Sequence, residues 1–161
     1  EEAGGNLAAA VALMARDQAH PPLAGQILLS PMLDPCVGSA SQRRTTGDAV
    51  DCKWVQGWRN FLRCPRDAEH PYAVPASAHR LAGLPPTLVL VGDTDPMRDE
   101  ALAYAARLHA AGLQVTQHVF AKAEKWPEPL LETGPHECPC AGAVQEEFRR
   151  FFEATRCRES S

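Results

Sequence analysis

The sequence predicts an α/β protein in which a parallel sheet is flanked by helices. Short apolar runs bounded by Gly and Pro are typical of strands buried on both faces, and segments with helical periodicity alternate with them along the chain. Strands that alternate with helices form right-handed crossovers within a parallel sheet. Only three such strands can be recognised, so the chain resembles part of a larger sheet.

The amino-terminal part predicts a helix, a strand and a long insertion. Asn6–Asp17 is an alanine-rich helix with Leu7, Val11 and Met14 at helical spacing, and the prolines at 21 and 22 end it. Residues 24–30 form the first strand. Turn-forming residues dominate from 31 to 86, except for an amphipathic helix over 53–62. An insertion of this length between strands usually covers a site.

The second part continues the alternation of strand and helix. Residues 87–91 form the clearest strand, which ends in the Gly- and Asp-rich segment 92–96. A helix over 99–111 stops at Gly112, and a strand follows over 115–120. The last helix covers 144–154. Its apolar side chains are expected to face inward, namely Val144, Phe148, Phe151 and Phe152.

Composition excludes several classes of protein. A chain of 161 residues with 45% apolar and 22% charged residues is typical of one globular domain. The net charge of -4 and the scattered Lys and Arg argue against a nucleic-acid partner. No apolar run reaches the roughly 20 residues of a membrane span. The six cysteines are expected to be free thiols in a reducing cytoplasm. We expect no cofactor.

Several ordered segments resemble the hormone-sensitive-lipase type of α/β-hydrolase, a family of carboxylester hydrolases. The start, Glu-Glu-Ala-Gly-Gly-Asn-Leu, is similar to that family's nucleophile elbow, Gly-Asp-Ser-Ala-Gly-Gly-Asn-Leu, with Glu2 in place of the serine. The other matching segments are 23–34, 70–75, 81–87 and 95–100. The resemblance implies the C-terminal half of an α/β-hydrolase: a partial domain over 1–161, with a cap-like insertion and return segment over 31–86.

The same resemblance implies roles for individual residues. Asp95 opens the motif Asp-Pro-Met-Arg-Asp-Glu and corresponds to the acid of the catalytic triad. Glu2 holds the nucleophile position, and Ala3 would supply one backbone N–H of the oxyanion hole. Glu2 could itself be a carboxylate nucleophile, although no base that would resolve its acyl anhydride is evident. The family's His-Gly-Gly-Gly loop is not found here, which suggests a fragment or a truncated product.

The catalytic base is less well defined. The family's His-Gly-Phe is replaced by Lys-Trp-Pro, which aligns Lys125 with the histidine. A lysine is mostly protonated near neutral pH and is a poor substitute for imidazole. His136 in the following loop is a weak alternative, and His118 is expected to be packed or exposed in its strand. His136, Cys138 and Cys140 could bind zinc, but no fourth ligand is evident, so a loop with free thiols is favoured.

Three functional hypotheses follow. The first is a carboxylic ester hydrolase, esterase or lipase-like, that uses a serine-hydrolase mechanism on a small acyl ester, with Trp54 and Trp58 either lining an acyl pocket or only packing their helix. The second is a catalytically inactive remnant or binding module, because the serine and the loop histidine are missing. The third is half of a foldable unit that self-associates through its open sheet edge.

Overall fold

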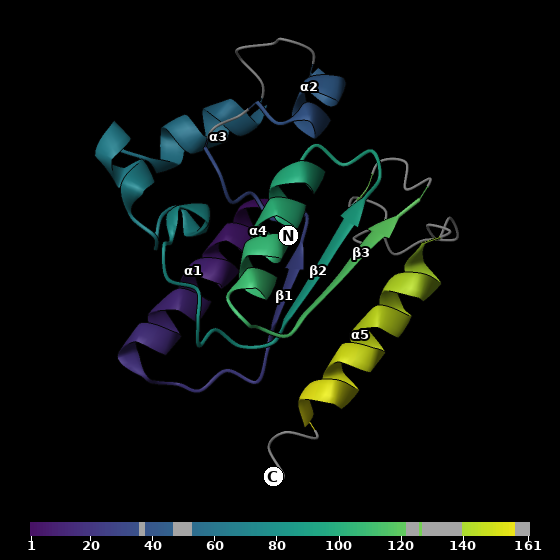
Figure 1. Cartoon of the computed structure of the whole chain (residues 1–161). Coiled ribbons are helices and arrows are strands. Elements are labelled where there is room, and N and C mark those ends of the chain that lie inside the picture. The colour runs from purple at the N-terminus through teal and green to yellow at the C-terminus, as the bar shows by residue number, and fades with distance from the viewer. Residues whose placement is uncertain (36–37, 47–52, 122–125, 127–139, 157–161) are drawn as a thin grey trace.

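The computed structural model describes residues 1–35, 38–46, 53–121, 126 and 140–156. The helices and strands alternate as the sequence predicts (Figure 1). In chain order they are α1 (Glu2–Gln18), β1 (Gln26–Leu29), α2 (Ala40–Thr46), α3 (Lys53–Phe61), the 3-10 helices η1 (Pro65–Glu69) and η2 (Pro75–Ser77), β2 (Thr87–Gly92), α4 (Arg98–Ala110), β3 (Val115–Phe120) and α5 (Ala141–Arg156).

The three described strands form a parallel sheet in the order β1-β2-β3. The register pairs Gln26 with Thr87 and Thr87 with Val115, so all three strands start level with one another. Every residue of the central strand β2 is buried. Because the strands are parallel, their carboxyl ends meet at one edge of the sheet, as ligand-binding α/β sheets require. The predicted α/β fold is confirmed.

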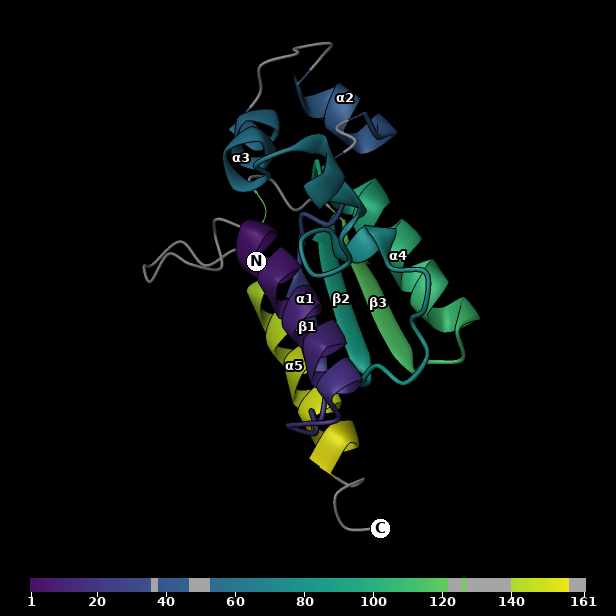
Figure 2. The same ribbon diagram turned by 90° about the vertical axis from the view of Figure 1, so that its left-hand side faces the viewer.

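Helices cover both faces of this sheet. Helices α1 and α4 pack on one face of the sheet and α5 on the other (Figures 1 and 2). A hydrophobic core lies on each face of the sheet, and the side chains of β2 alternate between the two. Val89 and Val91 pack with α1 and α4. Leu88 and Leu90 pack with Val144 and Phe151 of α5. The carboxyl edge of the sheet is therefore part of a scaffold with helices packed on both faces.

Packing sets the faces that α1 and α5 turn toward the sheet, and one expectation about them is wrong. In α1 the apolar residues at positions 7, 11 and 14 are exposed, and the face against the sheet consists mainly of alanines together with Leu13. Small side chains let the helix lie close to β1, which helical spacing alone does not reveal. In α5 the side chain of Phe152 is 54% exposed instead of facing inward.

The helices α2 and α3 of the insertion between β1 and β2 lie beyond the carboxyl ends of the strands (Figure 1). The sequence did not predict α2, which hydrogen bonds tie to the start of α4. The backbone N–H of Ser41 donates to Asp99 Oδ2 over 2.8 Å, and the hydroxyl of Ser41 donates to the carbonyl of Pro96 over 2.7 Å. The insertion is thus attached to the segment that carries Asp95.

None of the described helices combines the length and the apolar character that a membrane span requires.

Candidate functional site

The carboxyl edge of the sheet brings together one buried polar side chain from the end of each strand. Ser30 follows β1, Asp95 follows β2 and Trp126 follows β3. The Ser30 hydroxyl donates to Asp95 Oδ2, and the Trp126 indole donates from Nε1 to Ser30 Oγ over 2.7 Å. The sequence predicted Asp95 here, whereas Ser30 and Trp126 were missed as site residues.

Asp95 lies in a desolvated position and is 2% exposed. Burial raises the pKa of its carboxyl group, and the nearby charge of Glu2 acts in the same direction. Hydrogen bonds from the Ser30 hydroxyl and the Met97 backbone N–H, the latter to Oδ1 over 2.8 Å, oppose this shift. Asp95 is therefore held in one orientation by a donor at each oxygen, as an orienting acid should be.

Glu2 occupies a strained turn at the start of α1. Its φ of 38° lies in the left-handed region that side-chain-bearing residues rarely adopt. The Met32 backbone N–H donates to the Glu2 carbonyl over 3.0 Å, and Glu2 forms an isolated parallel bridge with Pro31. These contacts fix the start of α1 against the segment that follows β1. A sharp turn of this kind is what a nucleophile elbow needs.

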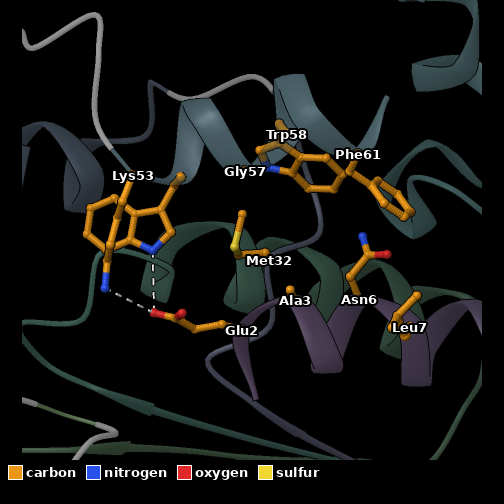
Figure 3. A pocket seen from close by; sticks show the side chains of 10 residues that line it. Glu2, Ala3, Asn6, Leu7, Met32, Lys53, Gly57, Trp58 and Phe61 are labelled. Atoms are coloured by element: carbon orange, nitrogen blue, oxygen red, sulfur yellow. Dashed lines mark hydrogen bonds and ion pairs between the residues drawn. The ribbon is translucent and has the colours of Figure 1, made fainter. Parts of the chain in front are cut away.

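The Glu2 carboxylate is already engaged by the insertion. Trp54 donates from Nε1 to Glu2 Oε1 over 3.4 Å, and Lys53 Nζ lies 3.8 Å from the same oxygen (Figure 3). The Lys53 ammonium also lies over the Trp54 ring, 4.8 Å from its centroid. A carboxylate with these two partners is bound in place instead of being free to attack an ester.

A pocket of about 290 Å³ opens beside Glu2, between α1 and α3. Figure 3 shows the side chains of α3 above it and those of α1 below it. Its lining is mainly apolar: Ala3, Leu7, Met32, Gly57, Trp58 and Phe61, with Glu2, Asn6, Lys53 and Trp54 as polar or partly polar members. The pocket has the size and the lining of a small-molecule site.

The structure brings together only some of the predicted site residues. Ala3 lies next to Glu2 on the pocket wall. Lys125 and His136 fall outside the described residues. His118 lies on β3, where its Nδ1 is 3.7 Å from a carboxylate oxygen of Glu147 on α5. Ser30 and Met97 donate hydrogen bonds to the Asp95 carboxylate, and among the described residues no hydrogen bond joins it to a histidine.

The cysteines depart in part from expectation. Cys64 is an exposed free thiol, but Cys140 is disulfide-bonded, so the expected free thiol at Cys140 is wrong. Spacing in a sequence does not show which cysteines folding brings close enough to bond. A disulfide sulfur is not a thiolate ligand, which removes Cys140 from the zinc alternative. In the part of the chain that the structure describes, no other cluster of His, Cys, Asp and Glu could hold a metal ion.

Glu100, one turn into α4, is a second buried carboxyl group and leads to a prediction on stability. Burial raises its pKa to about 8, from 4.5, even though Leu33 donates its backbone N–H to Oε1 over 2.8 Å. Between these two values the folded protein keeps a proton that the unfolded chain has lost. The free energy of unfolding should therefore fall as pH rises from about 4.5 to about 8, by at most about 1.4 kcal/mol per pH unit.

Glu100→Gln should flatten this decline, as chemical denaturation at pH 5.5, 7.0 and 8.5 would measure. The exposed Glu153→Gln serves as the control and should leave the slope unchanged. An equal loss of stability at all three pH values in Glu100→Gln would contradict the assignment.

The strained turn at the start of α1 and the buried carboxylate that follows β2 have the arrangement expected of an α/β-hydrolase, with the apolar pocket beside the turn. The chain belongs to the alpha/beta hydrolase fold family, whose sequence model matches residues 1–124. This confirms the resemblance to hormone-sensitive-lipase-type hydrolases that the sequence motifs indicated.

Known relatives agree with this assignment. Esterase LipI of Mycobacterium tuberculosis is 33% identical over 122 residues, which cover 73% of this chain and 38% of LipI. A gibberellin receptor of Arabidopsis thaliana is 37% identical over 71% of this chain and 35% of its own length. The structure of a thermostable esterase from Pseudomonas putida matches with a TM-score of 0.68 and 35% identity, over 74% of this chain and 40% of the esterase. The chain thus spans well under half the length of these relatives.

Proposed function

We propose that the protein contributes the acid, the elbow and the acyl pocket of a carboxylic ester hydrolase. The observation that carries the proposal is the position of Glu2. It occupies the strained turn at the start of α1, on the wall of an apolar pocket, and its charge acts on the buried Asp95. With serine at this position, the attack on an ester would start from the pocket wall, and Asp95 would orient the base.

In this mechanism each part has a distinct task. The acyl chain enters the pocket between Trp58 and Met32, and the Ala3 backbone N–H supplies one donor to the oxyanion. Asp95 holds the imidazole of a base in the tautomer that accepts the serine proton. His136 remains the proposed base, with Lys125 at the aligned position. Residues 31–86 form a cap-like insertion and its return segment, and the part that acts as a cap is α2 and α3, which lie over the carboxyl edge of the sheet.

The acyl pocket leads to a prediction on chain-length preference. Butyryl esters bury two more methylenes than acetyl esters, at about 0.8 kcal/mol each, which corresponds to a preference of about 15-fold in kcat/KM. A Cβ at Gly57 would lie 4.0 Å from Met32 Cε, so a larger side chain there enters the pocket without a backbone collision. In the protein carrying Glu2→Ser, Gly57→Leu should remove the preference.

The measurement compares kcat/KM for p-nitrophenyl acetate and butyrate. Gly57→Ala is the matched control, because a single methyl group leaves the pocket open and should keep the preference. A butyrate preference that survives Gly57→Leu would place the acyl chain elsewhere.

A second candidate function is a binding module that holds an acyl compound without cleaving it. The observation that favours it is the engaged Glu2 carboxylate, with Trp54 and Lys53 as its partners and no serine at the elbow. One relative is itself named a receptor and not an esterase. Titration calorimetry with a non-hydrolysable butyl ketone should detect binding by the unmodified chain. Ester turnover by that chain, abolished by Asp95→Asn, would refute this candidate.

Self-association through the sheet edge is a further proposal. In the described residues β1 pairs only with β2, and the exposed apolar residues Leu7, Val11 and Met14 lie on the adjacent helix α1. An unpaired apolar edge favours pairing with another chain. Light scattering coupled to gel filtration should show a dimer or larger species, and a monodisperse monomer at all concentrations would contradict the proposal.

A cytoplasmic location also stays a proposal. The exposed free thiol of Cys64 is compatible with a reducing compartment, whereas the disulfide at Cys140 is more typical of an oxidising one. Thiol alkylation in freshly lysed cells tests it: a Cys140 that becomes labelled only after reduction would argue against the cytoplasm.

A further inference from the structure

The hydroxyl of Ser30 joins one residue from each of the segments that follow the three strands into a hydrogen-bond network. Trp126 donates to Ser30, and Ser30 donates to Asp95. The three residues are buried, with exposed fractions of 6%, 0% and 2%. Because the site is so enclosed, bulk water cannot readily replace a missing partner.

The donor and acceptor roles in this hydrogen-bond network follow from the chemistry of the side chains. An indole N–H can only donate, so Ser30 Oγ must accept from Trp126 and has its own proton left for another acceptor. Asp95 Oδ2 is that acceptor. The backbone N–H of Ser30 donates a hydrogen bond to the Leu90 carbonyl over 3.0 Å. The φ of Ser30 is 42°. Such a left-handed conformation persists in a non-glycine residue only where the surroundings enforce it.

We propose that Ser30 is a positioning residue for the acid Asp95, and that Trp126 fixes the direction in which the Ser30 hydroxyl points. This inference rests on the proposed function, in which Asp95 orients the catalytic base. Met97 holds Oδ1 from one side and Ser30 holds Oδ2 from the other. The plane of the carboxylate is thereby set before any base approaches it.

The arrangement suits the ionised form of Asp95. A protonated Oδ2 would present a second donor to Ser30, and the serine proton would then need another acceptor. The Ser30 bond therefore opposes the upward pKa shift that burial imposes on Asp95. The charges of two other carboxylates, Glu2 of α1 and Glu100 of α4, interact with that of Asp95. The variants Glu2→Gln and Glu100→Gln distinguish the titration of these two groups from that of Asp95.

The test uses the full chain and needs no catalysis. The protein contains three tryptophans, and Trp126→Phe assigns its indole N–H signal in ¹⁵N spectra. We expect this signal to shift between pH 3 and 9 in one main step that disappears in Asp95→Asn and persists in Glu2→Gln and Glu100→Gln. In Ser30→Ala the step should be lost, and the ¹³C carboxyl signal of Asp95 should titrate about one pH unit higher.

Ser41→Ala is the matched control. Ser41 is also buried, at 3%, but its hydroxyl donates to the Pro96 carbonyl and not to Asp95. It should leave both titrations unchanged. The indole signals of Trp54 and Trp58 report whether each variant is folded. Should Ser30→Ala not fold, Trp126→Phe is the second variant, and it should raise the pH at which Asp95 titrates by a smaller amount.

Two results would overturn the inference. The first is a Trp126 indole signal that does not change when Asp95 ionises. The second is an Asp95 carboxyl group that titrates at the same or a lower pH in Ser30→Ala or, if that variant does not fold, in Trp126→Phe. A coupled titration together with absent ester turnover in every variant would instead count against the proposed function alone.

Discussion

Asp95→Asn is expected to lower ester turnover by about 10⁴-fold in the protein carrying Glu2→Ser, the magnitude seen when a triad acid becomes an amide. Asparagine keeps the size of the side chain but loses the charge that stabilises a protonated base. Its amide would also place a donor where the base presents its own N–H. The loss should appear in kcat for p-nitrophenyl butyrate, with little change in KM, because the acyl pocket is untouched.

Asp99→Asn is the appropriate comparison. Asp99 lies four residues further along the same segment and accepts a hydrogen bond from Ser41, which asparagine can also accept. Turnover in this variant should stay within a few-fold of its parent. An Asp95→Asn variant that retains more than a tenth of the turnover would show that Asp95 is not the acid.

Gly5→Ala is expected to destabilise the fold by about 2 kcal/mol, because the new methyl group would overpack the elbow. A Cβ at Gly5 would lie 2.9 Å from both Cα and Cβ of Pro31, closer than non-bonded carbons come. Because the Cα of Pro31 is a backbone atom, relief of this contact requires α1 to move away from the segment that follows β1. Glu2 sits at the start of that helix, so the same substitution should displace the residue at the nucleophile position.

Gly4→Ala provides a matched control on the preceding residue. A Cβ at Gly4 meets nothing within 4 Å, so alanine should be neutral or stabilise the helix by up to about 1 kcal/mol. Urea denaturation of the two variants measures the contrast. Equal effects at both positions would mean that the close approach of α1 to Pro31 does not hold in solution.

Much of the fold could be predicted from local patterns. The strand over 115–120 has the predicted bounds, and Gly112 adopts the positive φ, 81°, expected after a helix end. The helix α1 starts at Glu2, four residues before its predicted start, because the contact with Pro31 organises residues that lack helical periodicity. The polar helix α2 was missed since its stability comes from bonds to α4, far along the chain.

The site was predictable only where a motif marked it. Asp95 could be found because its position after a buried strand and its neighbours both point to it. Ser30 and Trp126 belong to the same network, yet they are 65 and 31 residues from Asp95 in sequence, and neither residue type signals an acid's partner. One signal was available for Ser30, which directly follows a strand and precedes a proline.

The most direct test of the central claim is hydrolysis of p-nitrophenyl butyrate by the purified protein beside its Glu2→Ser variant. We expect no turnover above background for the unmodified protein, and turnover in Glu2→Ser that Asp95→Asn abolishes. Turnover by the unmodified protein that Glu2→Ser leaves unchanged would contradict the placement of the elbow at Glu2. Absence of turnover in both the unmodified protein and Glu2→Ser would contradict an ester hydrolase and leave the binding module as the function of this chain.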